Sequence, residues 1–243
     1  MSVKVSLVIP LFNEARCLEA NVGRVAAYLA SCHREWELLL VNDGSTDTSA
    51  AIARRLAGDH DRIRLIDSGV NRGKGHAVRT GMMLAQGERR LFMDADLAVP
   101  IEFAGRIFDR LAQGDPVVIG SRHLEASALR IREGALRQFM GAVYRRIILW
   151  GFGLPVSDIT CGLKGFSAAA AADIFSRARI DRWGYDAELL FIAKKLGYAV
   201  AEVPVDWYHS FDSAVRVGRD SLVTILETVQ IWQNHLLGRY RIP

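Results

Sequence analysis

Short runs of apolar residues alternate along this chain with longer segments in which apolar residues recur every three to four positions. Several of the runs are apolar on both faces, which is typical of parallel strands covered by helices on both sides. The predicted strands are residues 5–9, 36–41, 63–66, 90–93, 117–119 and 199–205, and the predicted helices between them are residues 14–30, 46–56, 75–85 and 101–111. This alternation, regular over roughly the first 120 residues, predicts a doubly wound, mostly parallel α/β sheet.

Composition narrows the class of protein only a little. The chain has 243 residues, of which 24% are charged, and no internal repeat or linker-like segment divides it, so we expect one domain over residues 1–243. The net charge of +4 fits an anionic small substrate, a phospholipid surface or nucleic acid. Three cysteines without CxxC spacing predict reduced thiols in a cytoplasmic setting. Neither a secretory signal nor a transmembrane helix is predicted.

Polar and charged residues follow the predicted strands, at the edge of the sheet where doubly wound folds bind their ligands. The segments, in chain order, are Pro10-Leu11-Phe12-Asn13-Glu14, Asn42-Asp43-Gly44-Ser45, Asn71-Arg72-Gly73-Lys74-Gly75, Asp94-Ala95-Asp96 and Gly120-Ser121-Arg122. Turn-forming loops alone would scatter polar residues and would rarely collect acids, amides and bases at one edge. The sequence therefore predicts a polar site there.

Asp94 and Asp96 directly follow an apolar strand and are the most informative pair in the chain. Two carboxylates so close raise each other's cost of ionisation. A divalent cation resolves the conflict, because Mg²⁺ or Mn²⁺ takes one or two carboxylates and fills its other positions with substrate phosphates. The alternative is a solvated turn after a strand. We predict that Asp94 and Asp96 hold a metal ion.

Two further loops carry candidate binding chemistry. Asp43 lies at a strand exit, where it could contact a ring N–H or a ribose hydroxyl, whereas Ser45 is better explained as a helix cap. Residues 71–75 combine Arg72 and Lys74 with glycines, which predicts a phosphate cradle of backbone N–H groups. The loop has neither the spacing of a P-loop nor that of the dinucleotide fingerprint.

The last hundred residues contain two basic amphipathic segments. A helix is predicted over residues 135–150, and a second apolar stripe lies near the C-terminus. The two stripes consist of Leu136, Phe139, Met140, Val143, Ile147 and Trp150, and of Leu222, Ile225, Leu226, Val229, Trp232 and Leu236. Each stripe could face the core, or it could lie in a membrane interface with arginines toward lipid phosphates. Two such helices in one chain favour docking on a membrane.

The order of these motifs resembles that of family 2 glycosyltransferases with a GT-A fold. Two later segments narrow the likeness, although each alone could be the capped start of a helix. They are D-x-x-C-G-x-K-x-F from Asp158 to Phe166, and W-x-Y-D-x-E-L-L-F-I-A from Trp183. Both look like the polyprenyl-phosphate (dolichyl-phosphate) β-glucosyltransferases, relatives of the dolichyl-phosphate mannosyltransferases. The resemblance covers residues 5–237.

That family implies a nucleotide-diphosphate sugar donor, Mg²⁺ or Mn²⁺, and a polyprenyl phosphate acceptor at the cytosolic face of a membrane. UDP-glucose is the favoured donor, and transfer is expected to be inverting and limited to one sugar. Residues 1–122 would bind the donor, and residues 123–243 the acceptor and the membrane interface. A phosphate acceptor is largely dianionic at pH 7 and needs no strong general base.

The resemblance also implies roles for individual residues. Pro10, Asn13, Glu14 and Asp43 would bind the nucleoside, and Arg72 and Lys74 would flank the donor. Asp94 would lie against ribose or metal, Asp96 would coordinate the metal, and Ala95 and Asp186 would be near substrate. Arg122, Arg137 and Lys164 would hold the acceptor phosphate. Asp158 occupies the place of a proposed catalytic carboxylate.

Three alternatives remain open at this point. The donor could be GDP-mannose, or the acceptor could be a soluble hydroxyl. A different class of protein would bind nucleotide or nucleic acid without turnover, and its basic helices would then bind phosphate backbones. The pairing of Asp94 and Asp96 with a cationic loop counts against that class, so we expect no nucleic-acid partner.

Overall fold

The computed structural model describes residues 3–33, 35–127, 135–208 and 217–241, and within them only the backbone of residues 135–140 and 217–222. The strands are β1 Val5–Leu11, β2 Trp36–Asn42, β3 Ile63–Asp67, β4 Arg89–Phe92, β5 Val117–Ser121, β6 Lys164–Ser167 and β7 Val200–Pro204. They form one sheet in the order β3-β2-β1-β4-β6-β5-β7, and every pairing is parallel except those of β6. The predicted doubly wound, mostly parallel sheet is confirmed.

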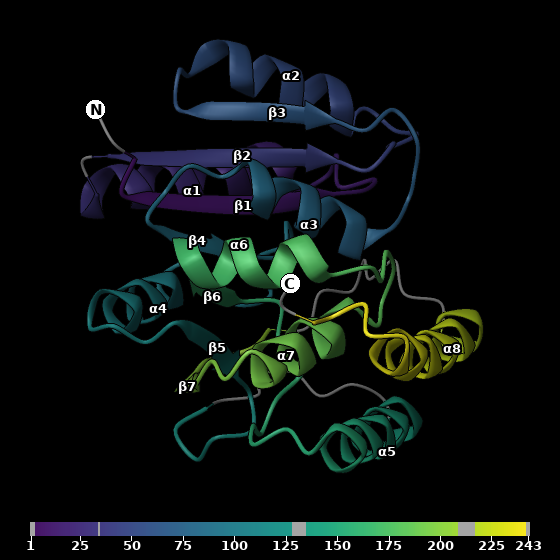
Figure 1. Cartoon of the computed structure of the whole chain (residues 1–243). Coiled ribbons are helices and arrows are strands. Elements are labelled where there is room, and N and C mark those ends of the chain that lie inside the picture. The colour runs from purple at the N-terminus through teal and green to yellow at the C-terminus, as the bar shows by residue number, and fades with distance from the viewer. Residues whose placement is uncertain (1–2, 34, 128–134, 209–216, 242–243) are drawn as a thin grey trace.

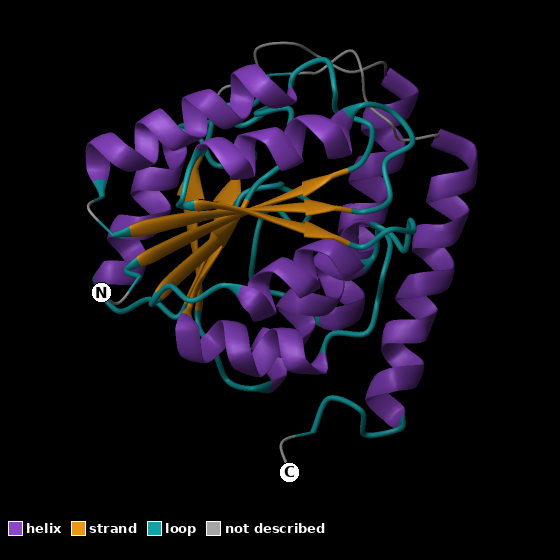
Figure 2. Cartoon of the chain, turned by 90° about the horizontal axis from the view of Figure 1, so that it is seen from above, coloured by secondary structure: helices purple, strands orange, loops and turns teal. Residues whose placement is uncertain are grey.

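Helices cover both faces of this sheet (Figure 2). They are α1 Leu18–Cys32, α2 Ser49–Asp59, α3 Lys74–Leu84, α4 Phe103–Ala112, α5 Ala135–Phe152, α6 Ala168–Arg177, α7 Tyr185–Lys195 and α8 Val217–Leu236. Successive side chains of a strand point to opposite faces, which divides the apolar core in two. Val8 of β1 belongs to the core formed with α3, α6 and α7, whereas Leu7 and Ile9 belong to the core formed with α1, α2 and α4. Strands that are apolar on both faces therefore build the middle of the sheet.

Strand β6 was not predicted from the sequence. It has only four residues, it includes Gly165, and it pairs antiparallel with β4 on one side and β5 on the other. A Cβ atom at Gly165 would lie 2.3 Å from Cγ2 of Ile107 in α4, so the strand can pass under that helix only as glycine. The alternative of a capped helix start at residues 158–164 is therefore wrong, because distant strands determine the conformation that follows. The insertion of β6 places residues 157–163 between the ends of β4 and β5.

The helices α5 and α8 lie beyond the sheet edge toward which the arrowheads of β2 and β3 point (Figure 1). The ring of Phe152 in α5 stacks on Trp232 in α8, with 5.3 Å between the ring centroids. Among the described residues, no helix combines the length and the apolar content needed to cross a membrane.

Candidate active site

The exits of β1 and β4 bring three carboxylates close to one ammonium group. Lys74, the first residue of α3, places its Nζ 2.6 Å from Oδ1 of Asp94. Burial raises the pKa of Asp96, and the charge of Asp94 raises it further. Burial also raises the pKa of Glu14 to about 7, with contributions from the charges of Asp96 and Asp94. Carboxylates that raise one another's pKa in this way form a site that attracts a cation.

Gly162 forms the wall behind Asp94. A Cβ atom at this position would lie 2.1 Å from Oδ2 and 2.5 Å from Cγ of Asp94, so no side chain fits between them. The glycine of the D-x-x-C-G-x-K motif therefore packs directly against Asp94. No local pattern predicted this contact, because residues 94 and 162 meet only through the insertion of β6.

The donor set fits a metal ion that takes most of its ligands from substrate. Among the described residues, no group of three or more His, Cys, Asp or Glu side chains is placed to hold a metal alone. Asp94 and Asp96 nevertheless supply the one or two carboxylates with which Mg²⁺ or Mn²⁺ sites bind nucleotide phosphates. The raised pKa of Asp96, caused by burial and by Asp94, is a cost that such an ion would remove. That Asp94 and Asp96 hold a metal ion stays a prediction.

A buried ion pair lies behind the carboxylates. Nζ of Lys164 is 2.5 Å from Oδ1 of Asp186 and 2.6 Å from the carbonyl oxygen of Cys161, and the lysine is fully buried. Burial raises the pKa of Asp186, although Lys164 and then Lys74 oppose the shift. Lys164 therefore faces Asp186 and not the open side of the site. In this geometry, Lys164 cannot make its predicted contact with an acceptor phosphate.

The loop at residues 71–75 is held by protein contacts along most of its backbone. The N–H groups of Arg72 and Gly73 donate to the two carboxylate oxygens of Asp43, at 3.0 and 2.8 Å. The N–H of Gly75 donates to the carbonyl of Arg182. Cβ atoms at Gly73 and Gly75 would lie 2.4 and 2.5 Å from the carbonyl oxygens of residues 181 and 180. The glycines thus permit close packing, and the predicted cradle of free backbone N–H groups is wrong.

The segment that supports this loop is itself fixed by carboxylates that sequence analysis missed. Glu188 of α7 accepts hydrogen bonds from the N–H groups of Arg179 and Ile180, and Glu227 of α8 accepts from those of Arg182 and Gly184. Nothing in the local sequence pattern distinguishes Glu227 from a surface residue of an amphipathic helix. Residues 71–75 are therefore connected to α8 through the backbone of residues 182–184.

The remaining predicted donor residues have structural contacts in this conformation. Oδ1 of Asn13 accepts from the N–H groups of Thr46 and Asp47, which joins the β1 and β2 exits. Pro10 is buried in β1, beyond the last residue paired with β4, so its missing N–H breaks no bond to that strand. The carbonyl of Ala95 accepts from Nδ2 of Asn21. Their contacts to a nucleoside stay predictions.

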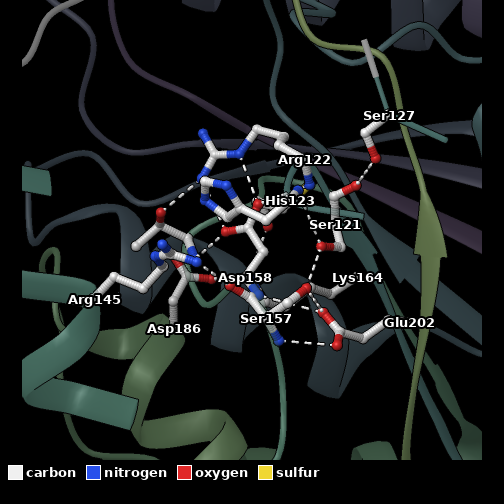
Figure 3. A network of polar contacts seen from close by, with 12 residues as sticks. Ser121, Arg122, His123, Ser127, Arg145, Ser157, Asp158, Lys164, Asp186 and Glu202 are labelled. Atoms are coloured by element: carbon white, nitrogen blue, oxygen red, sulfur yellow. Dashed lines mark hydrogen bonds and ion pairs between the residues drawn. The ribbon is translucent and has the colours of Figure 1, made fainter. Parts of the chain in front are cut away.

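A second polar cluster lies at the exit of β5 (Figure 3). The guanidinium of Arg122 donates to both oxygens of Asp158, at 2.7 and 2.9 Å, and the Arg122 backbone N–H donates to the same carboxylate. Burial alone would raise the pKa of Asp158, but the hydrogen bonds and charge of Arg122 outweigh it and hold that pKa well below its usual range. Asp158 is therefore a fixed anion that orients Arg122.

Glu202 of β7 organises the loop beneath this pair. Its carboxylate accepts from the hydroxyl and the backbone N–H of Ser157, at 2.7 and 2.8 Å, and the Ser157 hydroxyl also contacts that of Ser121 at 2.6 Å. Arg145 of α5 donates to the Ser157 carbonyl at 2.9 Å, which adds a second guanidinium to the cluster (Figure 3). Sequence analysis did not single out Glu202, because a lone acid in a short strand carries no distinctive spacing.

The side chain of Arg137, predicted to bind the acceptor, lies outside the described residues, as do those of Leu136, Phe139, Met140 and Leu222. The described part of the two apolar stripes faces outward. Trp150 is 91% exposed and Leu236 79% exposed. Other exposed members are Val143, Ile147, Ile225, Leu226, Val229 and Trp232. A stripe facing the core is therefore the wrong alternative for these residues, except for Trp232, whose ring also packs on Phe152 and Phe191 of the core.

Comparison with known proteins agrees with this geometry. A family model described as glycosyl transferase family 2 matches residues 6–175. The chain is 35% identical over 226 residues to a dolichyl-phosphate β-glucosyltransferase of Trichomonas vaginalis, covering 88% of this chain and 67% of that protein. It is 30% identical over 263 residues to a dolichyl-phosphate β-glucosyltransferase of Drosophila melanogaster, covering 99% and 78%.

Solved structures show the same fold at lower identity. Glucosyl-3-phosphoglycerate synthase from Mycobacterium tuberculosis, in complex with Mn²⁺, UDP and phosphoglyceric acid, superposes with a TM-score of 0.68 at 19% identity. The match covers 99% of this chain and 80% of that one. The same synthase in complex with Mn²⁺ and UDP-glucose gives a TM-score of 0.67 at 19% identity.

Proposed function

We propose, from the premise that this chain belongs to glycosyl transferase family 2, that it transfers one hexose from a nucleotide-diphosphate sugar to a polyprenyl phosphate. UDP-glucose is the favoured donor and dolichyl phosphate, or a similar polyprenyl phosphate, the acceptor. The names of the curated relatives support the acceptor and the transferred glucose. The proposed product is a polyprenyl-phosphate hexose with inverted configuration at the anomeric carbon.

The donor would lie at the exits of β1 to β4. Asp94 and Asp96 would hold Mg²⁺ or Mn²⁺, which supplies charge neutralisation for the departing nucleotide diphosphate when it is bound. The side chains of Arg72 and Lys74 lie on the same loop and would balance the remaining phosphate charge. Pro10, Asn13, Glu14, Asp43 and Ala95 would line the nucleoside, with Asp186 behind them.

The paired Asp158 is the observation that carries the choice of acceptor. A hydroxyl acceptor must lose a proton as it attacks, whereas a phosphate monoester is already largely dianionic at pH 7. Arg122 holds the pKa of Asp158 well below its usual range, so this carboxylate is a weak base for drawing a proton from a hydroxyl. The cluster instead presents guanidinium groups, from Arg122 and Arg145, that suit a phosphate.

Transfer would then proceed in one step. A phosphate oxygen of the acceptor forms a bond to the anomeric carbon, and the bond from that carbon to the donor diphosphate breaks, with the electron pair leaving on the diphosphate. Arg122 would orient the attacking phosphate, and Asp158 would fix Arg122. Positioning and charge stabilisation would supply most of the rate.

Membrane contact would be made by α5 and α8. Their outward apolar residues, among them Trp150, Leu226 and Leu236, lie close to the exposed cations Arg146 and Arg239 in the sequence. Tryptophan and arginine beside aliphatic side chains suit the boundary between lipid head groups and acyl chains. Both helices lie at the sheet edge that holds the proposed site (Figure 1), so a lipid-borne phosphate would enter from the bilayer surface.

The test is a matrix of donors and acceptors. The full chain is incubated with Mn²⁺ or Mg²⁺, with UDP-glucose or GDP-mannose, and with polyprenyl phosphate, polyprenol or 3-phosphoglycerate, and the products are identified by mass. We expect a hexosyl polyprenyl phosphate from UDP-glucose. A mannosyl product would mean that GDP-mannose, and not UDP-glucose, is the donor. A product from polyprenol or 3-phosphoglycerate alone would refute the proposed acceptor. No product with any pair would refute the proposed function.

A further inference from the structure

The contact between Lys74 and Asp94 has a consequence for the order in which ligands bind. Nζ of Lys74 lies 2.6 Å from Oδ1 of Asp94, and both side chains are about 70% buried, with 27% and 32% of their area exposed. The lysine is therefore a charged ammonium held on the carboxylate.

Asp94 has little freedom to turn away from this ammonium. Gly162 lies against the carboxylate so closely that a Cβ atom there would be 2.1 Å from Oδ2. Oδ2 thus lies closest to the backbone of residue 162, and Oδ1, which would be 2.8 Å from the same Cβ, contacts Lys74. Oδ1 is buried in this conformation, so a metal ion could reach it only after the ammonium had moved away.

Apart from Asp94, no carboxylate of the described residues interacts strongly with the ammonium of Lys74. Asp186, the next carboxylate to influence it, is 2.5 Å from Nζ of Lys164 and is neutralised by that buried partner. A protonated amine has three hydrogen-bond donors and no lone pair, so Lys74 cannot join Asp94 as a ligand of a metal ion. The flexible four-carbon stem of lysine can instead move its charge to a nearby anion.

We propose that Lys74 is a built-in counter-ion of the donor site, which occupies Asp94 until the nucleotide diphosphate draws the ammonium away and a divalent cation takes its place. This proposal rests on the proposed function, because it assumes that Asp94 and the diphosphate share a cation. It predicts that the metal binds poorly alone and well with nucleotide. By thermodynamic linkage, the metal must strengthen nucleotide binding by the same factor.

The experiment measures binding of Mn²⁺ to the full chain without acceptor, by electron paramagnetic resonance of free Mn²⁺, with and without UDP. Wild type should bind Mn²⁺ weakly alone and about tenfold or more tightly with UDP, a typical coupling between sites. Lys74→Met should bind Mn²⁺ alone about tenfold more tightly than wild type, with reduced coupling to UDP. Lys74→Arg should restore the weak binding, and adding Asp94→Asn to Lys74→Met should remove the gain.

Arg55→Met is the control, because it removes an exposed cation of α2 whose ion pairs are to Glu19 and Asp59 and not to Asp94. It should leave the affinity for Mn²⁺ alone unchanged. Circular dichroism and the melting temperature establish that each variant is folded. The proposal is overturned if folded Lys74→Met gains no affinity for Mn²⁺, or if wild type binds Mn²⁺ equally with and without UDP. Neither result depends on sugar transfer, so failure of this proposal can be distinguished from failure of the proposed function.

Discussion

Replacing Gly162 by alanine should disable the donor carboxylate without removing any polar group. The new Cβ would lie 2.1 Å from Oδ2 of Asp94, where ordinary contact begins at 3.4 Å, so the carboxylate or the loop must retreat by about 1.3 Å. Lys74 contacts the other oxygen, Oδ1, at 2.6 Å, which limits how far the carboxylate can turn. Misplacement of about 1 Å costs roughly 100-fold in rate, or about 2.7 kcal/mol of transition-state stabilisation.

The assay is the initial rate of sugar transfer over a range of donor concentrations, together with calorimetric binding of UDP in the presence of Mn²⁺. We expect kcat/KM for the donor to fall by about 100-fold, with weaker UDP binding. Gly58→Ala is the matched control, because a Cβ there meets nothing within 4 Å. Unchanged kcat/KM and UDP affinity in folded Gly162→Ala would refute the assignment of Gly162 as the wall of Asp94.

Three further predictions address the metal, the acceptor and the membrane. Asp96→Ala should abolish metal-stimulated turnover, measured by titrating Mn²⁺ into the transfer assay, and retained stimulation would contradict the metal assignment. Asp158→Asn should lower kcat/KM for the acceptor by roughly 10- to 100-fold by loosening Arg122, yet keep the shape of the pH profile above pH 6, because Arg122 already holds the pKa of Asp158 low. Loss of an acidic limb in the variant would instead mean that Asp158 accepts a proton. Replacing Trp150 and Leu226 together by serine should reduce flotation with anionic liposomes, whereas Met83→Ser, an exposed apolar residue on α3, should not; equal flotation of both would contradict docking through α5 and α8.

The sequence predicted the sheet and its polar edge because both depend on local patterns. Runs such as residues 36–41 are apolar on both faces, and parallel strands place all their carboxyl ends on one side. Asp94, Asp96, Glu14 and Lys74 are consequently close together, as their positions after successive strands implied.

The sequence could not reveal how distant backbone segments use the same residues. The glycines at 73 and 75 suggested an anion cradle, but they exist because residues 180 and 181 pass within contact distance. Lys164 looked like a phosphate ligand until β6 placed it in the core beside Asp186. The partner of each residue lies about a hundred positions away or across an unpredicted strand, where neither periodicity nor spacing reports it.

The continuous segment of residues 158–164 contacts both polar clusters, the one around Asp94 and the one around Arg122. Asp158 fixes Arg122, Gly162 touches Asp94, and Lys164 pairs with Asp186. If the proposed donor and acceptor sites are correct, seven consecutive residues contact both of them, and donor and acceptor preferences could not change independently through substitutions here. Attempts to change the proposed lipid acceptor should then leave this segment intact and vary the outer surface of α5 instead.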